Sequence, residues 1–293
     1  MAAIFRRELG LLFGGWRAWT YLALTLALGG ALCFTQNLSG ANPAYQQAVP
    51  LVAIGYLLTV PLLAMDACPG DRRRGTDRLL AALPLRPIAV AAGKYWALAM
   101  PVAIGSAALM AFPAAMTPYG QVPMAAAAGA IAMHLLLGAM LTAAALFMSA
   151  LSRGQWTGFF TAALLLCAMY FAPQAAAWLA AARTLTAPAL VVVALAALAL
   201  GWLVCRNGAA ALAVALIVEL GVIASRLASR EDLAIGALRA AARALAAFDR
   251  LTAVQYGLFD GAAAWYYLTA TALLLGLSGL ALARRVGWKG AKA

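Results

Sequence analysis

The chain has 293 residues, of which 66% are hydrophobic and only 10% are charged, a balance that excludes an ordinary soluble globular domain. Its net charge is +12, but the basic residues gather at the ends of apolar segments. That distribution is typical of membrane topology signals and excludes a nucleic-acid-binding groove. The composition therefore predicts an all-α, polytopic helical membrane protein. Its four cysteines have no CxxC spacing and are expected to be small buried apolar residues rather than metal ligands or disulfides.

Residues 1–15 mix Arg6, Arg7 and Glu8 with Ile, Phe and Leu. This mixture predicts a short amphipathic helix that lies in the membrane interface and leads into the first span. A cleaved signal peptide is the alternative interpretation. No small-residue cleavage site closes the apolar run and further apolar segments follow, so we expect the segment to be retained.

Several apolar stretches reach about 18 residues, the length that crosses a bilayer as a helix. We expect about eight spans, at residues 16–34, 49–65, 88–112, 123–150, 156–171, 187–204, 209–224 and 266–283. Pro101 and Pro113 are expected to break the third of them. A six-span arrangement, with residues 187–224 as a re-entrant pair, is the alternative.

Eight spans place both termini on one side of the membrane. Most of the 21 Lys and Arg residues fall on that side, so cytoplasmic termini are expected. The opposite, extracytoplasmic side carries residues 225–262, where arginines recur among Leu and Ala at helical spacing. Ser229 precedes Glu231 and Asp232 there as at a helix start, which predicts one or two amphipathic helices.

The most charged interval is the loop at residues 66–94, between the second and third spans. Its arginines place it in water on the cytoplasmic face. Gly75 is a natural helix stop, and Thr76 can cap a second short helix that Pro84 ends after Leu83. We therefore expect a helix, a sharp turn and a short helix held flat on the membrane. Either this surface contacts a cytoplasmic partner, or its arginines only anchor the spans to lipid headgroups.

Three groups of motifs carry a resemblance to a known family. They are Arg73-Arg74-Gly75-Thr76-Asp77-Arg78-Leu79-Leu80 with Leu83-Pro84-Leu85 and Gly93-Lys94-Tyr95, then Met148-Ser149-Ala150-Leu151-Ser152-Arg153, and finally Phe248-Asp249-Arg250 with Gly257-Leu258-Phe259-Asp260 and Tyr266-Tyr267-Leu268. Together they resemble ABC-2-type ABC transporter permeases of the gliding-motility-type branch. The consecutive arginines stand where that family commonly has a glutamate-rich stretch, and the hairpin at 187–224 is additional to its six-span core.

The resemblance implies a permease subunit of an ATP-driven exporter in a bacterial inner (plasma) membrane. Its cytoplasmic loop at 66–87 would form a coupling helix that docks on a separate ABC ATP-binding subunit. A second copy or a related permease would complete the pathway. The implied coupling residues are Arg72, Arg73, Arg74, Gly75, Thr76, Asp77, Arg78, Leu79 and Leu80.

The resemblance also implies that ATP and its Mg²⁺ belong to the partner subunit. This chain lacks the phosphate-binding Gly-x-x-x-x-Gly-Lys-Ser/Thr pattern, because Gly93-Lys94 is followed by Tyr95, so it cannot bind ATP by that route. We expect the chain itself to have no catalytic or metal site and to bind no cofactor.

Two ionisable residues lie inside predicted spans, His134 in the fourth and Glu219 in the seventh. Such residues are costly in a bilayer and are candidates for function. Glu219 supports the main alternative, an ion-coupled secondary transporter in which this acid is the coupling group. For His134, a neutral ring bonded to a backbone carbonyl is the alternative to a functional role. A membrane enzyme is a third possibility, although no convergent His, acid and Ser constellation supports it.

Overall fold

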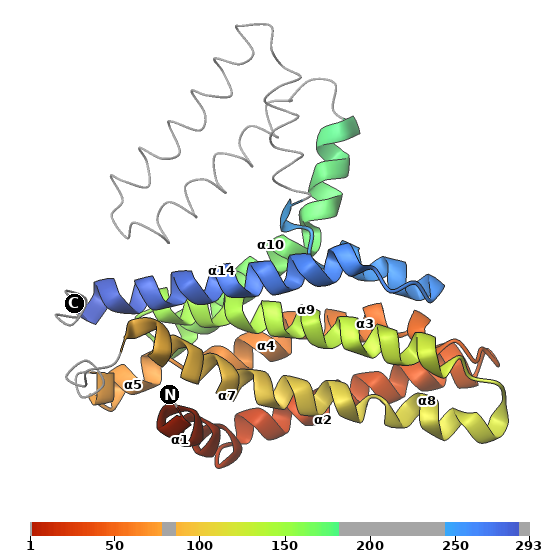
Figure 1. Cartoon of the computed structure of the whole chain (residues 1–293), viewed down its shortest axis with the longest axis horizontal. Coiled ribbons are helices and arrows are strands. Elements are labelled where there is room, and N and C mark those ends of the chain that lie inside the picture. The colour runs from red at the N-terminus through yellow and green to blue at the C-terminus, as the bar shows by residue number, and fades with distance from the viewer. Residues whose placement is uncertain (1, 78–85, 182–243, 287–293) are drawn as a thin grey trace, which may run out of the picture. The chain divides into compact units, whose positions relative to one another are not determined.

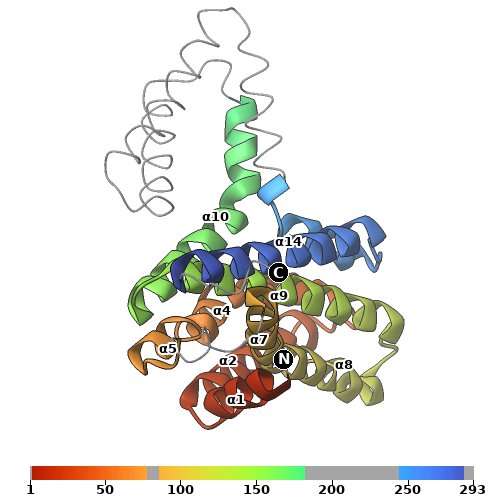
Figure 2. The same cartoon turned by 60° about the vertical axis from the view of Figure 1, so that its left-hand side comes forward.

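Figures 1 and 2 present a computed structural model that describes residues 2–77, 86–181 and 244–286. Every regular element in these residues is a helix, so the predicted all-α class is confirmed. The predicted spans at 187–204 and 209–224, Glu219 and the first half of the 225–262 region (225–243) lie outside the described residues. The chain divides into two compact units, residues 1–168 with 247–293, and residues 169–246. The candidate site belongs to the first unit.

Long apolar helices dominate the described residues. Five are long and apolar enough to cross a bilayer: Trp16–Leu38, Pro87–Tyr119, Met124–Leu151, Gln155–Gln174 and Gly261–Arg284. A bent pair, Tyr45–Ile54 with Tyr56–Arg73, makes a sixth if it counts as one span. These six correspond to the predicted spans that fall within the described residues, and they indicate a membrane-spanning protein.

The first two spans differ from simple rods. Helix α2 (Trp16–Leu32) continues as the π-helix η1 (Cys33–Leu38), so the first span is longer than predicted. After η2 (Tyr45–Gln47), the second span is bent by 50° between α3 (Val49–Ile54) and α4 (Tyr56–Ala64). The bend lies at Gly55, where a Cβ atom would stand only 2.6 Å from the Leu28 side chain of α2. Glycine permits this close approach of α2.

The prediction that Pro101 and Pro113 break the third span is wrong. Helix α7 (Pro87–Ala108) runs through Pro101, and α8 (Ala111–Met116) contains Pro113 and leads into η3 (Thr117–Tyr119). The interruption lies between the two prolines, at residues 109–110. Pro101 is buried among neighbouring helices, and such packing tolerates the loss of one backbone hydrogen bond inside a membrane-type helix.

Helix α9 (Met124–Leu151) is the centre of the first unit. In its most apolar 18-residue window, 72% of the residues are buried. It packs against α14 (Gly261–Val286), α7 and α4. Two further helices follow α9, namely α10 (Gln155–Ala181) and the 3₁₀ helix η4 (Asp249–Tyr256). The described part of the 225–262 region, residues 244–262, therefore contains a 3₁₀ helix with Leu251 and Val254 buried, and the first residues of α14.

Both ends of the first unit's bundle carry exposed aromatic side chains. Helices α1 (Ala2–Phe13) and α5 (Pro69–Arg73) lie at one end (Figure 1), and the exposed Trp16 and Trp19 begin α2 directly after α1, while the exposed Trp156 lies in the first turn of α10. The exposed Tyr119 ends η3, Tyr256 ends η4 and Trp265 lies in the first turns of α14. Two aromatic bands of this kind are typical of side chains at the two headgroup layers of a membrane.

The amino-terminal helix and the carboxyl end of α14 lie at the same end of this unit as the charged loop. Helix α1 packs on α7, and a Cβ atom at Gly279 of α14 would stand 3.1 Å from the Cα of Ile88, at the start of α7. Figure 1 shows α1, α5 and this end of α14 together. The arrangement agrees with an even number of spans, and the cytoplasmic position of this end remains a prediction.

Candidate functional site

Helix α1 turns one acidic side chain inward. Its buried residues are Ile4, Glu8 and Leu12, which follow one another at the four-residue spacing of a single helix face. The predicted helix at residues 1–15 is therefore confirmed, while its place in the membrane interface remains a proposal. A carboxylate between two apolar neighbours needs a bonded partner, because burying an unpaired charge is very costly.

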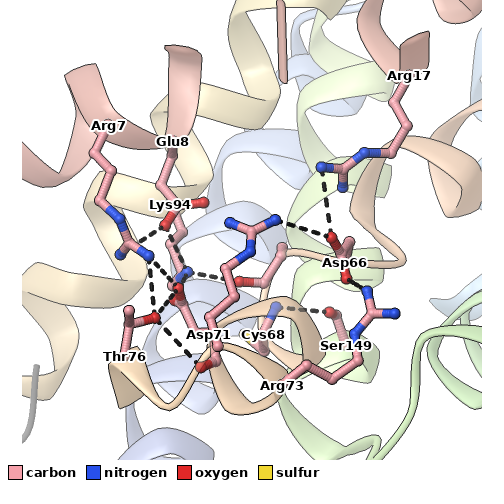
Figure 3. A network of polar contacts seen from close by, with 12 residues as sticks. Arg7, Glu8, Arg17, Asp66, Cys68, Asp71, Arg73, Thr76, Lys94 and Ser149 are labelled. Atoms are coloured by element: carbon pink, nitrogen blue, oxygen red, sulfur yellow. Dashed lines mark hydrogen bonds and ion pairs between the residues drawn. The ribbon is translucent and has the colours of Figure 1, made fainter. Parts of the chain in front are cut away.

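That partner is Lys94 of α7, whose side chain is only 2% exposed. Its Nζ atom donates to Glu8 Oε1 at 2.9 Å, to the Ala67 carbonyl oxygen at 2.6 Å and to Asp71 Oδ2 (Figure 3). A lysine ammonium has three donors, and all three are used. Lys94 thus joins the start of α7 to α1 and to the loop helix α5.

Asp71 of α5 is bonded on both of its oxygens. Oδ1 accepts from an Arg7 Nη atom at 2.6 Å and from Thr76 Oγ1 at 2.8 Å, and Arg7 also donates to Thr76 Oγ1 at 3.1 Å. We call Arg7, Glu8, Asp71 and Lys94 the Lys94 group. It holds two acids and two bases, so its charges balance, as a largely buried ionic cluster requires.

A second set of charges surrounds Asp66, and we call it the Asp66 group. Arg73 donates to Asp66 Oδ1, while an Nη atom of Arg17 lies 3.7 Å and one of Arg74 3.6 Å from Oδ2. The Asp66 carboxylate is only 8% exposed, whereas the Arg73 and Arg74 side chains are 56% and 44% exposed. This group connects the loop to the first turn of α2.

Arg72 connects the loop to the end of α9. Its guanidinium donates to the carbonyl oxygen of Ser152 and, at 2.9 Å, to that of Ala150. The Cys68 N–H also donates to Ser149 Oγ at 3.3 Å. A cation on the last carbonyls of a helix satisfies acceptors that the helix leaves open and complements its dipole. Two motifs that the sequence singled out separately, the loop and the 148–153 turn, are therefore in direct contact.

The predicted two-part organisation of the loop is present as far as the structure describes it. Helix α5 ends before Gly75, which has φ = 68°, a conformation that glycine adopts without strain. Thr76 and Asp77 resume a helical backbone, and the remainder, with Arg78, Leu79 and Leu80, lies outside the described residues. The Thr76 hydroxyl is bonded to Asp71 and Arg7, and the backbone that it was predicted to cap lies in the undescribed segment.

The implied coupling residues therefore have different surroundings. Arg73, Arg74 and Gly75 are exposed, whereas Arg72, Thr76 and Asp77 are half-buried. Arg72 faces α9 rather than the surface. A surface that contacts a partner would thus be formed by Arg73, Arg74 and the turn, with Arg72 holding it in place.

His134 lies in a separate cluster in the middle of the bundle. Its Nδ1 atom is 2.9 Å from Tyr56 Oη of α4 and 3.1 Å from Ser106 Oγ of α7, and the Tyr56 hydroxyl also reaches the His134 carbonyl oxygen at 3.2 Å. The Tyr56 and His134 rings are stacked with centroids 4.5 Å apart. The expected bond from the ring to a backbone carbonyl is therefore wrong, because two hydroxyl groups take that place. His134 Nε2 has no hydrogen-bond partner among the described residues.

Removing the Tyr56 hydroxyl should destabilise this cluster. We expect Tyr56→Phe to lower the free energy of unfolding by about 1–2 kcal/mol, because a buried hydrogen bond to the ring and one to the backbone are lost while Ser106 still reaches Nδ1. The measurement is denaturant unfolding in detergent micelles. Tyr119→Phe is the matched control, since Tyr119 is 85% exposed. Equal stabilities of the two variants would contradict the bonding of the cluster.

Sequence reasoning missed most of these partners. The sequence predicted only that Glu8 lies in an interfacial helix. Glu8 is the one acidic residue before Asp66, and this isolation could have indicated a specific basic partner. Lys94 was noted as part of a motif, without its acidic partners. Tyr56 and Ser106 gave no signal, because hydroxyl residues are common in apolar spans.

The fold and the site define a helical protein of the membrane-spanning kind, with a charged loop bonded into one end of its bundle. Comparison with protein-family models, with curated proteins and with solved structures gave no match. Among the described residues, no group of three or more His, Cys, Asp or Glu side chains could hold a metal ion.

Proposed function

We propose that the chain is the permease subunit of an ATP-driven ABC exporter and that its loop couples it to a separate ATP-binding subunit. The motif resemblance supports the class of protein. The observation that carries the coupling role is the set of charged contacts from the loop to four different helices, α1, α2, α7 and α9. A loop that only anchored spans to lipid headgroups would not need charged contacts buried inside the bundle, because desolvating them is costly.

These bonds provide a route for movement. A displacement of α5 would act on α1 and α7 through Asp71 and Lys94, on α2 through Asp66 and Arg17, and on α9 through Arg72. Cycles of ATP binding and hydrolysis in the partner would therefore tilt several spans together. In this proposal the termini are cytoplasmic, the membrane is a bacterial plasma membrane, and a second permease completes the pathway.

The test first asks whether a gene beside this one encodes an ATP-binding protein, and then measures co-purification of that protein with the chain. We expect Arg73→Glu with Arg74→Glu to reduce capture roughly tenfold or more, because reversing charges at a docking surface costs several kcal/mol. Arg72 is left intact, since its loss would free the end of α9. The control is Arg6→Glu with Arg284→Glu, which makes the same charge change at exposed positions of the same end.

Two outcomes would overturn the proposal. One is equal capture of the ATP-binding protein by the loop variant and the wild type. The other is equal loss in the loop variant and the control, which would indicate a general charge effect in place of docking.

A further inference from the structure

The two ionic groups differ in charge balance. The Lys94 group is neutral, but in the Asp66 group three guanidinium groups surround a single carboxylate. Two positive charges are therefore uncompensated within the Asp66 group. An excess of this kind at one place on a protein attracts an anion.

Two of the three guanidinium groups also have no hydrogen-bonded acceptor in the described part of the chain. Arg17 and Arg74 lie 3.7 and 3.6 Å from Asp66 Oδ2, beyond the range of about 2.7–3.2 Å for an N–H···O hydrogen bond. Neither side chain has another acceptor among the described residues. The Arg17 side chain is only 12% exposed, so most of the group that carries its five donors is shielded from bulk water. An anionic oxygen beside both guanidinium groups would bond them.

A small cavity lies between them. Its lining holds three bases, Arg17, Arg74 and Lys94, and three carboxylates, Glu8, Asp66 and Asp71, and Leu11, Leu12 and Leu98 form part of its wall. Its volume is about 10 Å³, which holds about one water-sized group. Because the carboxylates inside would repel an anionic oxygen, an anion has to bind at the mouth, beside the half-exposed Arg74.

The surroundings of Arg17 point to a lipid. Helix α2 begins at Trp16 with no side-chain cap and no acidic residue in its first turn, so its amino end adds positive potential beside Arg17. Trp16 and Trp19 flank Arg17 and are 58% and 60% exposed, as is typical of tryptophans at the headgroup layer. At that depth the abundant anion is the phosphate of a phospholipid.

We propose that Arg17 and Arg74 bind the phosphate of an anionic phospholipid at the mouth of this cavity. Arginine suits this ligand because its planar guanidinium can bond a phosphate through two N–H groups. Basic pockets between membrane helices bind lipid headgroups in this way. The inference requires a membrane around the bundle but does not depend on an ATP-binding partner.

The experiment measures lipid-dependent stability of the purified full chain in nanodiscs and in detergent. Nanodiscs contain phosphatidylcholine alone or with phosphatidylglycerol, and detergent samples are titrated with short-chain phosphatidylglycerol or inorganic phosphate. The test variant is Arg17→Gln with Arg74→Gln. The matched control is Arg6→Gln with Arg86→Gln, which removes two exposed charges near the same end without touching the cavity.

Phosphatidylglycerol is expected to raise the unfolding temperature of the wild type and of the control variant, relative to phosphatidylcholine. In the test variant we expect the apparent affinity for the short-chain lipid to fall about tenfold or more, because charge-assisted hydrogen bonds are lost. Arg17→Lys should give an intermediate affinity, since it keeps the charge without the planar donors. Size-exclusion chromatography in phosphatidylcholine nanodiscs establishes that the variants are folded.

Three results would overturn the inference. Equal affinities of test and control variants would show that the lipid responds to net charge. Inorganic phosphate that stabilises the wild type as well as the lipid does would assign the cavity to a soluble anion. Equal unfolding temperatures in the two nanodisc compositions would show that the site does not prefer an anionic phospholipid.

Discussion

Replacing Lys94 with methionine is expected to lower the free energy of unfolding by about 3–5 kcal/mol. Methionine has a similar length and suits apolar surroundings, so a cavity contributes little to this loss. The loss comes from Glu8 and Asp71, whose largely buried carboxylates would face an apolar side chain in place of the ammonium. Arg7 would still hydrogen-bond Asp71, but its other Nη atom lies 3.6 Å from Glu8 Oε1, beyond hydrogen-bond range, and compensates Glu8 only weakly. The measurement is denaturant unfolding in micelles or bicelles.

A charge-matched control separates burial from bonding. In Glu8→Gln with Lys94→Met, one buried acid and the buried base become neutral together, while Arg7 and Asp71 still pair. Replacing both partners of a buried ion pair is far less harmful than removing one, so most of the lost stability should return. A Lys94→Met variant within about 1 kcal/mol of the wild type would contradict the buried junction between α1, α5 and α7.

Gly138→Ala is expected to destabilise the protein by roughly 2–3 kcal/mol, against the local preference of a helix for alanine. Alanine gains about 1 kcal/mol over glycine inside a helix. At Gly138, however, the new Cβ atom would stand 2.5 Å from Tyr56 Oη and 2.7 Å from Val102 Cγ1. Tyr56 would have to move away from His134. The cost of overpacking and of the lost hydrogen bond therefore exceeds the gain in helix propensity.

Gly276→Ala in α14 is the matched control for this substitution. Among the described residues, no atom outside its own stretch of helix lies within 4 Å of the position of its Cβ atom. Only the helix propensity of alanine then contributes, so the free energy of unfolding should stay equal or rise by up to about 1 kcal/mol. Both variants can be followed by the same thermal or denaturant unfolding in detergent. If Gly138→Ala is as stable as Gly276→Ala, α9 does not pack against α4 and α7 as described.

Local features of this chain were predictable. The apolar runs predicted the positions of the long helices, with ends that differ by up to eight residues, because a helix that crosses a membrane satisfies its own backbone and needs only length and hydropathy. The turn at Gly75 was predictable for a similar reason, since a glycine after an arginine-rich segment can take a positive φ that ends the helix. The helix at residues 1–15 followed from its amphipathic composition.

Other features depended on packing. Pro101 fits within α7 because neighbouring helices surround it, and the bend at Gly55 reflects a side chain of α2 that approaches the backbone. The sequence carried residues able to break a helix at both places. The neighbouring helices determined that the chain bends at Gly55 and continues as a helix through Pro101.

The charges of the loop show the same division. By composition alone, the sequence determined that basic residues gather between the second and third spans. Only the tertiary structure decided that Arg72 bonds the end of α9 and that Lys94 lies between Glu8 and Asp71. Glu8 and Lys94 are 86 residues apart. Hydropathy and helix signals act over a few turns, whereas ion pairs at such separations exist only after the helices have packed.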